Sequence, residues 1–179
     1  MREAEVNAAA IHYHFGSKDN VLLELITRRL EPVSEKRLSL LDQCMETPED
    51  PRILEQIIEA FIGPVLEWAG SDASPYGRRI HAKLSFEYGE IQKRLYSDHA
   101  AFDRRFVNAL ERVLPHLSPE TIYWRFSFMV GYLIYVAAGV GRVEQLSGGL
   151  YDPNDTTRAI YQMVTTLSAG FRAPENSNS

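Results

Sequence analysis

The chain has few of the residue combinations that mark disulfide-bonded, metal-binding or catalytic proteins. Its single cysteine, Cys44, cannot form an internal disulfide. It contains no HExxH motif, no glycine-rich phosphate loop and no GxSxG motif. His12 and His14 are two residues apart, so on a helix they project about 200° from each other and cannot share one metal. We therefore expect no catalytic residues, no metal and no cofactor.

The sequence also lacks a net positive charge and a long apolar segment. The formal net charge is -5, so any contact with nucleic acid has to be local. The longest uncharged run, residues 126–141, has 16 residues, whereas a membrane span needs about 20 apolar ones. No charged and apolar leader precedes the fold. These absences predict a cytoplasmic protein with no membrane contact.

What the sequence does have is helical periodicity, and no stretch alternates with period two. Ser-Pro or Asp-Pro pairs, which favour helix starts, occur at residues 50–51, 74–75, 118–119 and 152–153. We predict helices at 7–14, 17–46 with a bend at Pro32, 51–69 with a kink at Pro64, 75–87, 90–114, 119–140 and 154–171. The glycine-containing segment 141–152 is predicted to be a loop. The fold class is therefore expected to be all-α, a helical bundle.

The uncharged run 126–141 predicts a helix that is buried on nearly every side. One core in a chain of 179 residues covers only one side of such a helix, and a second subunit is the simplest cover for the other. We expect a homodimer that pairs the helices at about 119–140 and 154–171 in a four-helix interface.

The stretch AAAIHYHFGSKDN, residues 8–20, combines a helix of small residues with a polar cluster. On a helix, Ile11 and Phe15 share one sector, whereas Ala9, His12 and Tyr13 share another. A helix with little side-chain bulk suits insertion into a DNA groove, with polar groups and a lysine at its end for phosphates. The alternative is an amphipathic helix whose polar residues simply face solvent.

The segment EVNAAAIHYHFGSKDNVLLELI resembles the end of the DNA-binding module of TetR-family transcriptional regulators, and the likeness covers about residues 2–30. The resemblance implies that this module ends in a short recognition helix, followed by an apolar helix. It implies structural roles for Ile11 and Phe15. The residues that it places on or near DNA are Asn7, Ala8, Ala9 and Ala10 in the groove, His12, Tyr13 and His14 on the backbone, and Lys18 on a phosphate.

The resemblance also predicts the domain organisation. Residues 1–46 are expected to form a partial DNA-binding domain and connecting helix, 47–172 an effector-binding and dimerisation domain, and 173–179 a disordered tail. A TetR-type module has three helices, and on this likeness the chain begins inside the second. Glu5 stands at a turn position where the family usually has glycine. We expect residues 1–179 alone to bind DNA weakly or not at all.

For a small, largely apolar effector, the candidate pocket residues lie in the domain after residue 47. They are Phe61, His81, Phe86, Phe106, Phe128 and Tyr132. The alternative for each aromatic residue is ordinary core packing. The function expected from the resemblance is a dimeric repressor that binds operator DNA, with effector binding releasing or altering DNA binding. The alternative is a helical dimer that binds a ligand or protein but has lost DNA binding.

Overall fold

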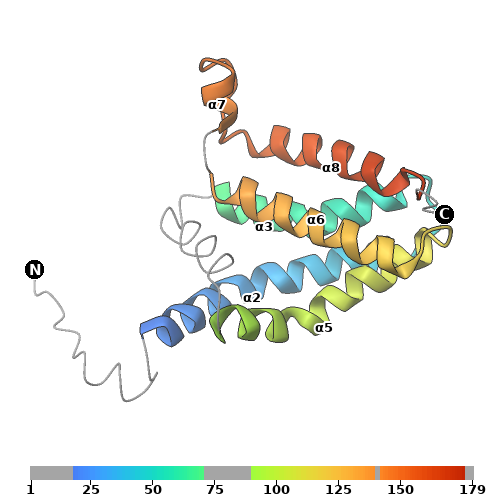
Figure 1. Ribbon diagram of the computed structural model, residues 1–179, viewed down its shortest axis with the longest axis horizontal. Coiled ribbons are helices and arrows are strands. Elements are labelled where there is room, and N and C mark those ends of the chain that lie inside the picture. The colour runs from blue at the N-terminus through green and yellow to red at the C-terminus, as the bar shows by residue number, and fades with distance from the viewer. Residues whose placement is uncertain (1–17, 71–89, 140–141, 176–179) are drawn as a thin grey trace, which may run out of the picture.

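The computed structural model describes residues 18–70, 90–139 and 142–175, and all the regular elements in these ranges are helices (Figure 1). They are α2 (Lys18–Cys44), α3 (Ile53–Gly70), α5 (Glu90–Val113), α6 (Pro119–Ala137), α7 (Arg142–Leu146) and α8 (Thr156–Arg172). The predicted all-α fold class is confirmed. The helices expected at 7–14 and 75–87 lie outside the described residues.

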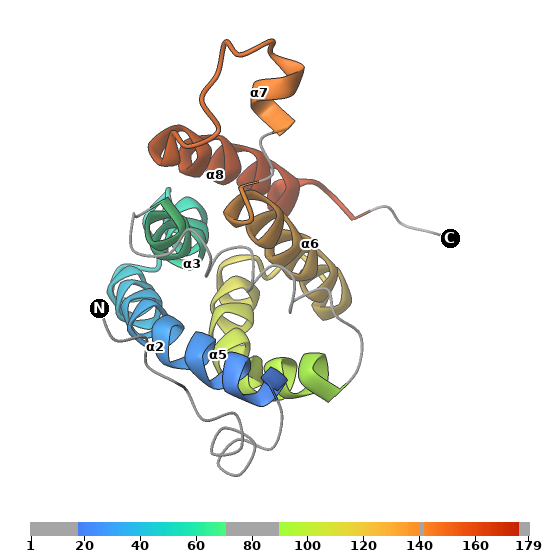
Figure 2. The same cartoon turned by 90° about the vertical axis from the view of Figure 1, so that its left-hand side faces the viewer.

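The central element of the bundle is α3, which contacts α2, α5, α6 and α8. Figures 1 and 2 show three tiers, with α2 and α5 in the lowest, α3 and α6 in the middle and α8 on top. The short α7 projects beyond the ends of α6 and α8, at the end of the long axis where α2 begins (Figure 1). No described helix has the length and apolar content needed to cross a membrane.

The position of α3 follows from its composition. Its predicted apolar face is buried, and Ile57, Ile58 and Ile62 have no exposed surface. Partners from the surrounding helices, including Phe106, Leu110 and Met129, complete a single core with it. The helix continues through Pro64, as α2 continues through Pro32. Burial of this apolar surface on all sides is the main source of stability of the bundle.

Within the described residues, helix starts follow the Ser-Pro and Asp-Pro signals with one correction, whereas the pair at 74–75 lies outside them. Ser118 caps α6 as predicted, since its Oγ accepts a hydrogen bond from the Thr121 amide at 3.2 Å and Pro119 follows it. For α8 the cap is Asp155, whose carboxylate accepts from the Arg158 amide at 2.9 Å. The Asp152 carboxylate instead accepts from the Asn154 amide at 2.8 Å, which makes a turn before the helix.

The segment 141–152, predicted as a loop, contains the helix α7 over Arg142–Leu146. All five of its residues are exposed, so it has no buried apolar stripe that a sequence pattern could reveal. Gly148 and Gly149, with φ angles of 62° and 86°, follow it in the left-handed region, and the Gly149 amide donates to the Glu144 carbonyl at 2.8 Å. The prediction of a loop was wrong for these five residues.

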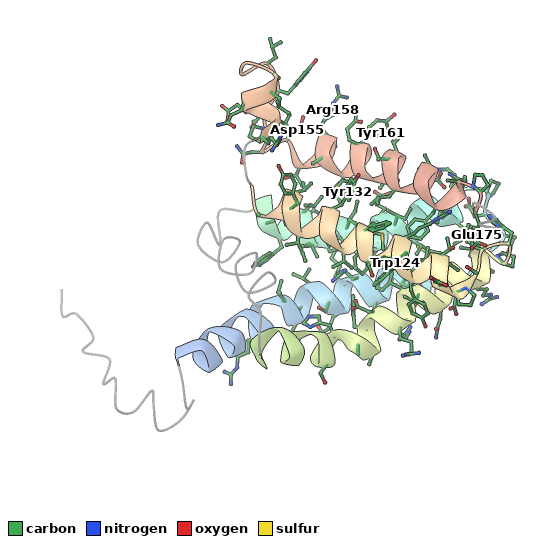
Figure 3. The ribbon with its side chains drawn as sticks, viewed as in Figure 1. Trp124, Tyr132, Asp155, Arg158, Tyr161 and Glu175 are labelled. Atoms are coloured by element: carbon green, nitrogen blue, oxygen red, sulfur yellow. The ribbon has the colours of Figure 1, made fainter. Side chains whose placement is uncertain are left out.

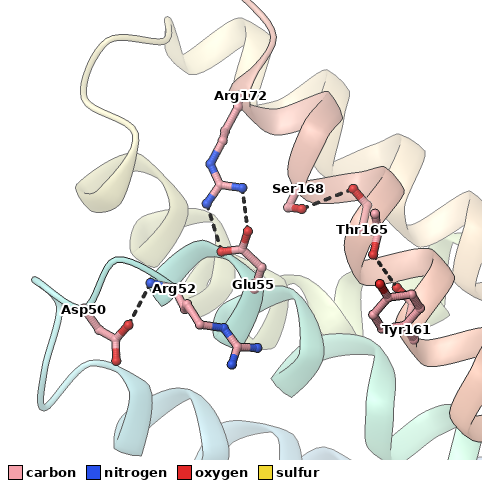
Figure 4. A network of polar contacts seen from close by, with 7 residues as sticks. All are labelled: Asp50, Arg52, Glu55, Tyr161, Thr165, Ser168 and Arg172. Carbon is pink, nitrogen blue, oxygen red and sulfur yellow. Dashed lines mark hydrogen bonds and ion pairs between the residues drawn. The ribbon is translucent and has the colours of Figure 1, made fainter.

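Several polar contacts join elements that are distant in the sequence. The Arg172 guanidinium at the end of α8 donates to both oxygens of the Glu55 carboxylate on α3, at 2.5 and 2.9 Å (Figure 4). Arg125 on α6 donates to the carbonyls of Phe171 and Ala173, both at 2.8 Å. The Glu175 carboxylate accepts from the Ser118 amide and hydroxyl. Residues 173–175, expected to belong to a disordered tail, are thus held against α6.

Candidate functional site

The interior of the bundle holds a cluster of four phenylalanines from three helices. Phe61 of α3 has ring-centroid distances of 4.9 Å to Phe106 of α5 and 5.2 Å to Phe126 of α6, both in edge-to-face geometry. Phe102 of α5 lies 5.2 Å from Phe106 and 6.3 Å from Phe61. Edge-to-face pairs at these distances stabilise a core beyond the area that they bury. We call these four residues the phenylalanine cluster.

Arg37 of α2 reaches into the phenylalanine cluster with its charged group. Its guanidinium carbon lies 4.0 Å from the ring centroid of Phe61, 4.4 Å from that of Phe102 and 5.8 Å from that of Phe106. The residue is only 7% exposed. Burial lowers the pKa of the guanidinium to about 9, against an opposing effect of Asp103, so the group is still mainly protonated at neutral pH. The structure thus places a cation among aromatic rings.

The nearby acidic group is Asp103, on the same helix as Phe102 and Phe106. Its side chain is half-buried, and burial raises the pKa of its carboxyl group, against the effects of His99 and Arg37. No ion pair between described residues joins Asp103 to Arg37. The site therefore combines a buried cation, aromatic faces and an acid that is not in direct contact with the cation.

The structure separates the predicted effector residues into two groups. Phe61 and Phe106 belong to the phenylalanine cluster. Phe128 and Tyr132 are 57% and 50% exposed, whereas Phe126 and Met129 on the same helix α6 are buried. Phe128 and Tyr132 therefore do not join the other two in one internal site. His81 and Phe86 lie outside the described residues.

Sequence reasoning missed Arg37, although the sequence carries a signal for it. Leu30, Arg37 and Leu41 are all buried, and they are spaced by seven and four residues along α2. This spacing places all three on one face of the helix. Arg37 therefore lies within an apolar stripe of α2, and this position in the sequence predicts a buried charge.

A second feature is the exposed face of α6 and α8. Trp124, Phe128, Tyr132 and Tyr135 follow one another at spacings of four, four and three residues, so they form one stripe on α6. The Trp124 and Phe128 rings are 6.0 Å apart. Tyr161 of α8 is also exposed (Figure 3). We call these five residues the aromatic face. The helix predicted to be buried on nearly every side thus has one side uncovered in the single chain.

A groove of about 450 Å³ lies at the end of the aromatic face, between the last turn of α6, the α7 segment and the start of α8. Tyr135 and Met163 are among its apolar lining residues, and Arg142 and Arg158 are its cations. Asp155 supplies an opposite charge, and its place beside Arg158 on α8 can be followed in Figure 3. Among the described residues, no group of histidine, cysteine or acidic side chains could hold a metal ion.

Residues 59–170 match the family model described as "Tetracyclin repressor-like, C-terminal domain". The chain belongs to the tetracyclin repressor-like (TetR) family. The match covers more than half of the chain and runs from the middle of α3 into α8. It includes all four residues of the phenylalanine cluster and the whole aromatic face, so both belong to the C-terminal domain of a TetR-family protein. No curated protein matched the chain.

The TetR family match begins after the segment that resembles a recognition helix. Asn7, Ala8, Ala9, His12, Tyr13 and His14 lie outside the described residues, and their contacts with DNA stay a prediction. Lys18 is the first residue of α2. One continuous helix therefore leads from the end of the recognition-helix segment to Arg37 and on to Cys44.

Proposed function

We propose that this TetR-family protein is a ligand-responsive transcriptional regulator, a repressor that binds operator DNA as a homodimer. The main support is the combination of the C-terminal domain match with the sequence motif HYHFGSK, residues 12–18. In this proposal Asn7, Ala8 and Ala9 face the major groove, because small side chains allow close approach to bases. His12, Tyr13, His14 and Lys18 contact the DNA backbone.

The proposed dimer forms through the aromatic face of α6 and α8. Large aromatic side chains that are about half exposed along one helix form an apolar patch that favours contact with another protein surface. In a two-fold dimer the same patch on each copy covers the other. Pairing α6 and α8 with their copies gives a four-helix interface, and each subunit then presents one recognition helix to a DNA half-site.

The proposed effector is a small, largely apolar molecule that binds in the C-terminal domain and releases the DNA. The phenylalanine cluster, with Phe61 and Phe106, offers aromatic surface that suits such a ligand. Arg37 of α2 contacts this cluster, and α2 begins at Lys18, at the end of the proposed DNA-binding segment. A shift of α2 would therefore move that segment directly. The proposed control of DNA binding therefore passes through one helix.

Selection from random double-stranded DNA tests this function. It is carried out with residues 1–179 and, in parallel, with any in-frame N-terminal extension that the gene encodes. We expect the polypeptide with a complete three-helix module to enrich a palindromic site, with affinity that falls steeply as salt rises. His14→Ala and Lys18→Ala should weaken binding to all sites alike. Failure of both polypeptides to enrich any site would favour a helical dimer that binds a ligand or protein.

A further inference from the structure

The charge of Arg37 is unusual because it is buried with no direct counter-ion among the described residues. None of the ion pairs between described residues involves Arg37, and its Nε is buried with no hydrogen-bond partner among them. Burying a charge is costly unless it is paired and hydrogen-bonded. An apolar side chain of similar volume would pack in the same place at lower cost, so packing alone does not explain this residue.

A purely structural interpretation explains only part of the geometry. The rings of Phe61 and Phe102 lie close to the guanidinium carbon, and such cation–π contacts would hold α2 against α3 and α5. The N–H donors of a guanidinium need hydrogen-bond acceptor atoms, however, and phenylalanine side chains have none. The ring contacts hold the guanidinium in place, but its buried Nε donor has no hydrogen-bond partner among the described residues.

One edge of the site is less buried than the rest. Phe102, Asp103 and His99 on α5 are all half-buried, whereas Phe61 and Phe106 are fully enclosed. A ligand that enters at this edge would meet the ring of Phe102 and the nearby cation. An anionic group in the plane of the guanidinium would give Arg37 the direct counter-ion that Asp103 does not provide.

We propose that Arg37 recognises the negative charge of a small carboxylate effector whose apolar body lies against Phe102. This inference rests on the proposed function, in which the C-terminal domain binds an effector, and it adds the charge of that ligand. A carboxylate suits the site because it accepts two parallel hydrogen bonds from a guanidinium. Since Arg37 is part of α2, the ligand would act directly on the helix that begins at Lys18.

The test compares matched acids and alcohols by calorimetric titration of the full chain. The probes are octanoate with octanol and 3-phenylpropionate with 3-phenylpropanol. We expect each carboxylate that binds to bind the wild type at least about ten-fold more tightly than its alcohol, because charge-assisted hydrogen bonds form only with the acid. Arg37→Met should remove this preference and leave the binding of the alcohol nearly unchanged. Asp103→Asn should strengthen carboxylate binding several-fold, since a competing anion is lost.

Circular dichroism spectra establish whether each variant folds. If Arg37→Met does not fold, Arg37→Lys is the second variant. It keeps a cation but loses the planar donors, so it should reduce the preference for the carboxylate over the alcohol without removing it. Equal affinity for acid and alcohol, no binding of either carboxylate, or a preference that survives Arg37→Met would each overturn the inference. Binding of the alcohols alone would overturn it and leave the proposed regulator function intact. Carboxylate binding by a protein that selects no DNA would support the inference and contradict the regulator function.

Discussion

A single glycine determines where α6 stops. Gly139 has a φ of 64°, in the left-handed region that an L side chain rarely adopts, and its amide donates to the Val136 carbonyl at 3.0 Å. We expect Gly139→Ala to lower the free energy of unfolding by about 1 kcal/mol. Gly63→Ala is the matched control, since Gly63 lies within α3 and an added Cβ meets only Glu59 Cγ at 3.9 Å.

For Gly63→Ala we expect the opposite sign, a gain of roughly 0.5–1 kcal/mol, because alanine favours a helix interior over glycine. Urea denaturation measures both changes. Two variants that shift stability in the same direction would contradict this account of the two glycines.

The ion pair of Glu55 and Arg172 should make stability depend on pH. Hydrogen bonds from Arg172 lower the pKa of the Glu55 carboxyl group, so the folded chain holds the proton less tightly than the unfolded chain. The stabilisation is therefore present above the unfolded-state pKa of about 4.3 and is lost as pH falls through the folded-state value. Glu55→Gln should cost up to about 1 kcal/mol at pH 7, and the difference should shrink in acid.

Chemical denaturation between pH 7 and pH 3 measures this difference. Glu59→Gln, one turn further along α3 with an exposed side chain, is the control for loss of a charge alone. A cost for Glu55→Gln that stays constant down to pH 3 would show that the ion pair is not its source.

At the scale of elements, the cap of α6 gives a direct test of how the sequence sets a helix start. Ser118→Ala removes the hydroxyl that accepts from the Thr121 amide, so we expect a loss of about 1 kcal/mol. Ser127→Ala on the same helix removes a hydroxyl that only donates to the Tyr123 carbonyl in an exposed position, and it should change stability by less than about 0.5 kcal/mol. Thermal unfolding compares the two, and equal effects would argue against the cap.

The elements that the sequence predicts well are those with a long apolar stripe. The helices expected at 17–46, 51–69, 90–114, 119–140 and 154–171 are α2, α3, α5, α6 and α8, with ends displaced by at most three residues. The end of α6 moves from 140 to Ala137 because Gly139 adopts a positive φ, which periodicity does not show. The short α7 has no buried face, so no pattern marks it.

The candidate site was less predictable than the helices, because it depends on which faces of different helices meet. Residues of one helix, such as Phe126 and Phe128, are alike in sequence but lie on opposite faces, one in the core and one in solvent. Arg37 lies 24 residues from Phe61, the nearest ring in the sequence that it contacts, and no local motif joins them. Periodicity can flag a cation in an apolar stripe, but it cannot identify the rings around that cation.

At the scale of the whole molecule, the aromatic face predicts a dimer. We expect light scattering to give about twice the chain mass of 20.4 kDa. Phe128→Asp should yield folded monomers, because a carboxylate at the centre of an apolar interface is buried without a partner. Asn108→Asp introduces the same charge at an exposed position of α5, and it should leave the dimer intact. A wild-type mass of one chain would contradict the proposed interface.

The unbroken course of α2 also has a mechanical consequence. The 19 residue steps from Arg37 back to Lys18 correspond to about 28 Å of helix. If the helix pivots near Arg37 by about 10°, its far end swings by roughly 5 Å, more than the 3.4 Å that separates successive base pairs. In the proposed regulator, a displacement of a few tenths of an ångström beside the arginine would thus be magnified into one large enough to take the proposed recognition helix out of register with its half-site.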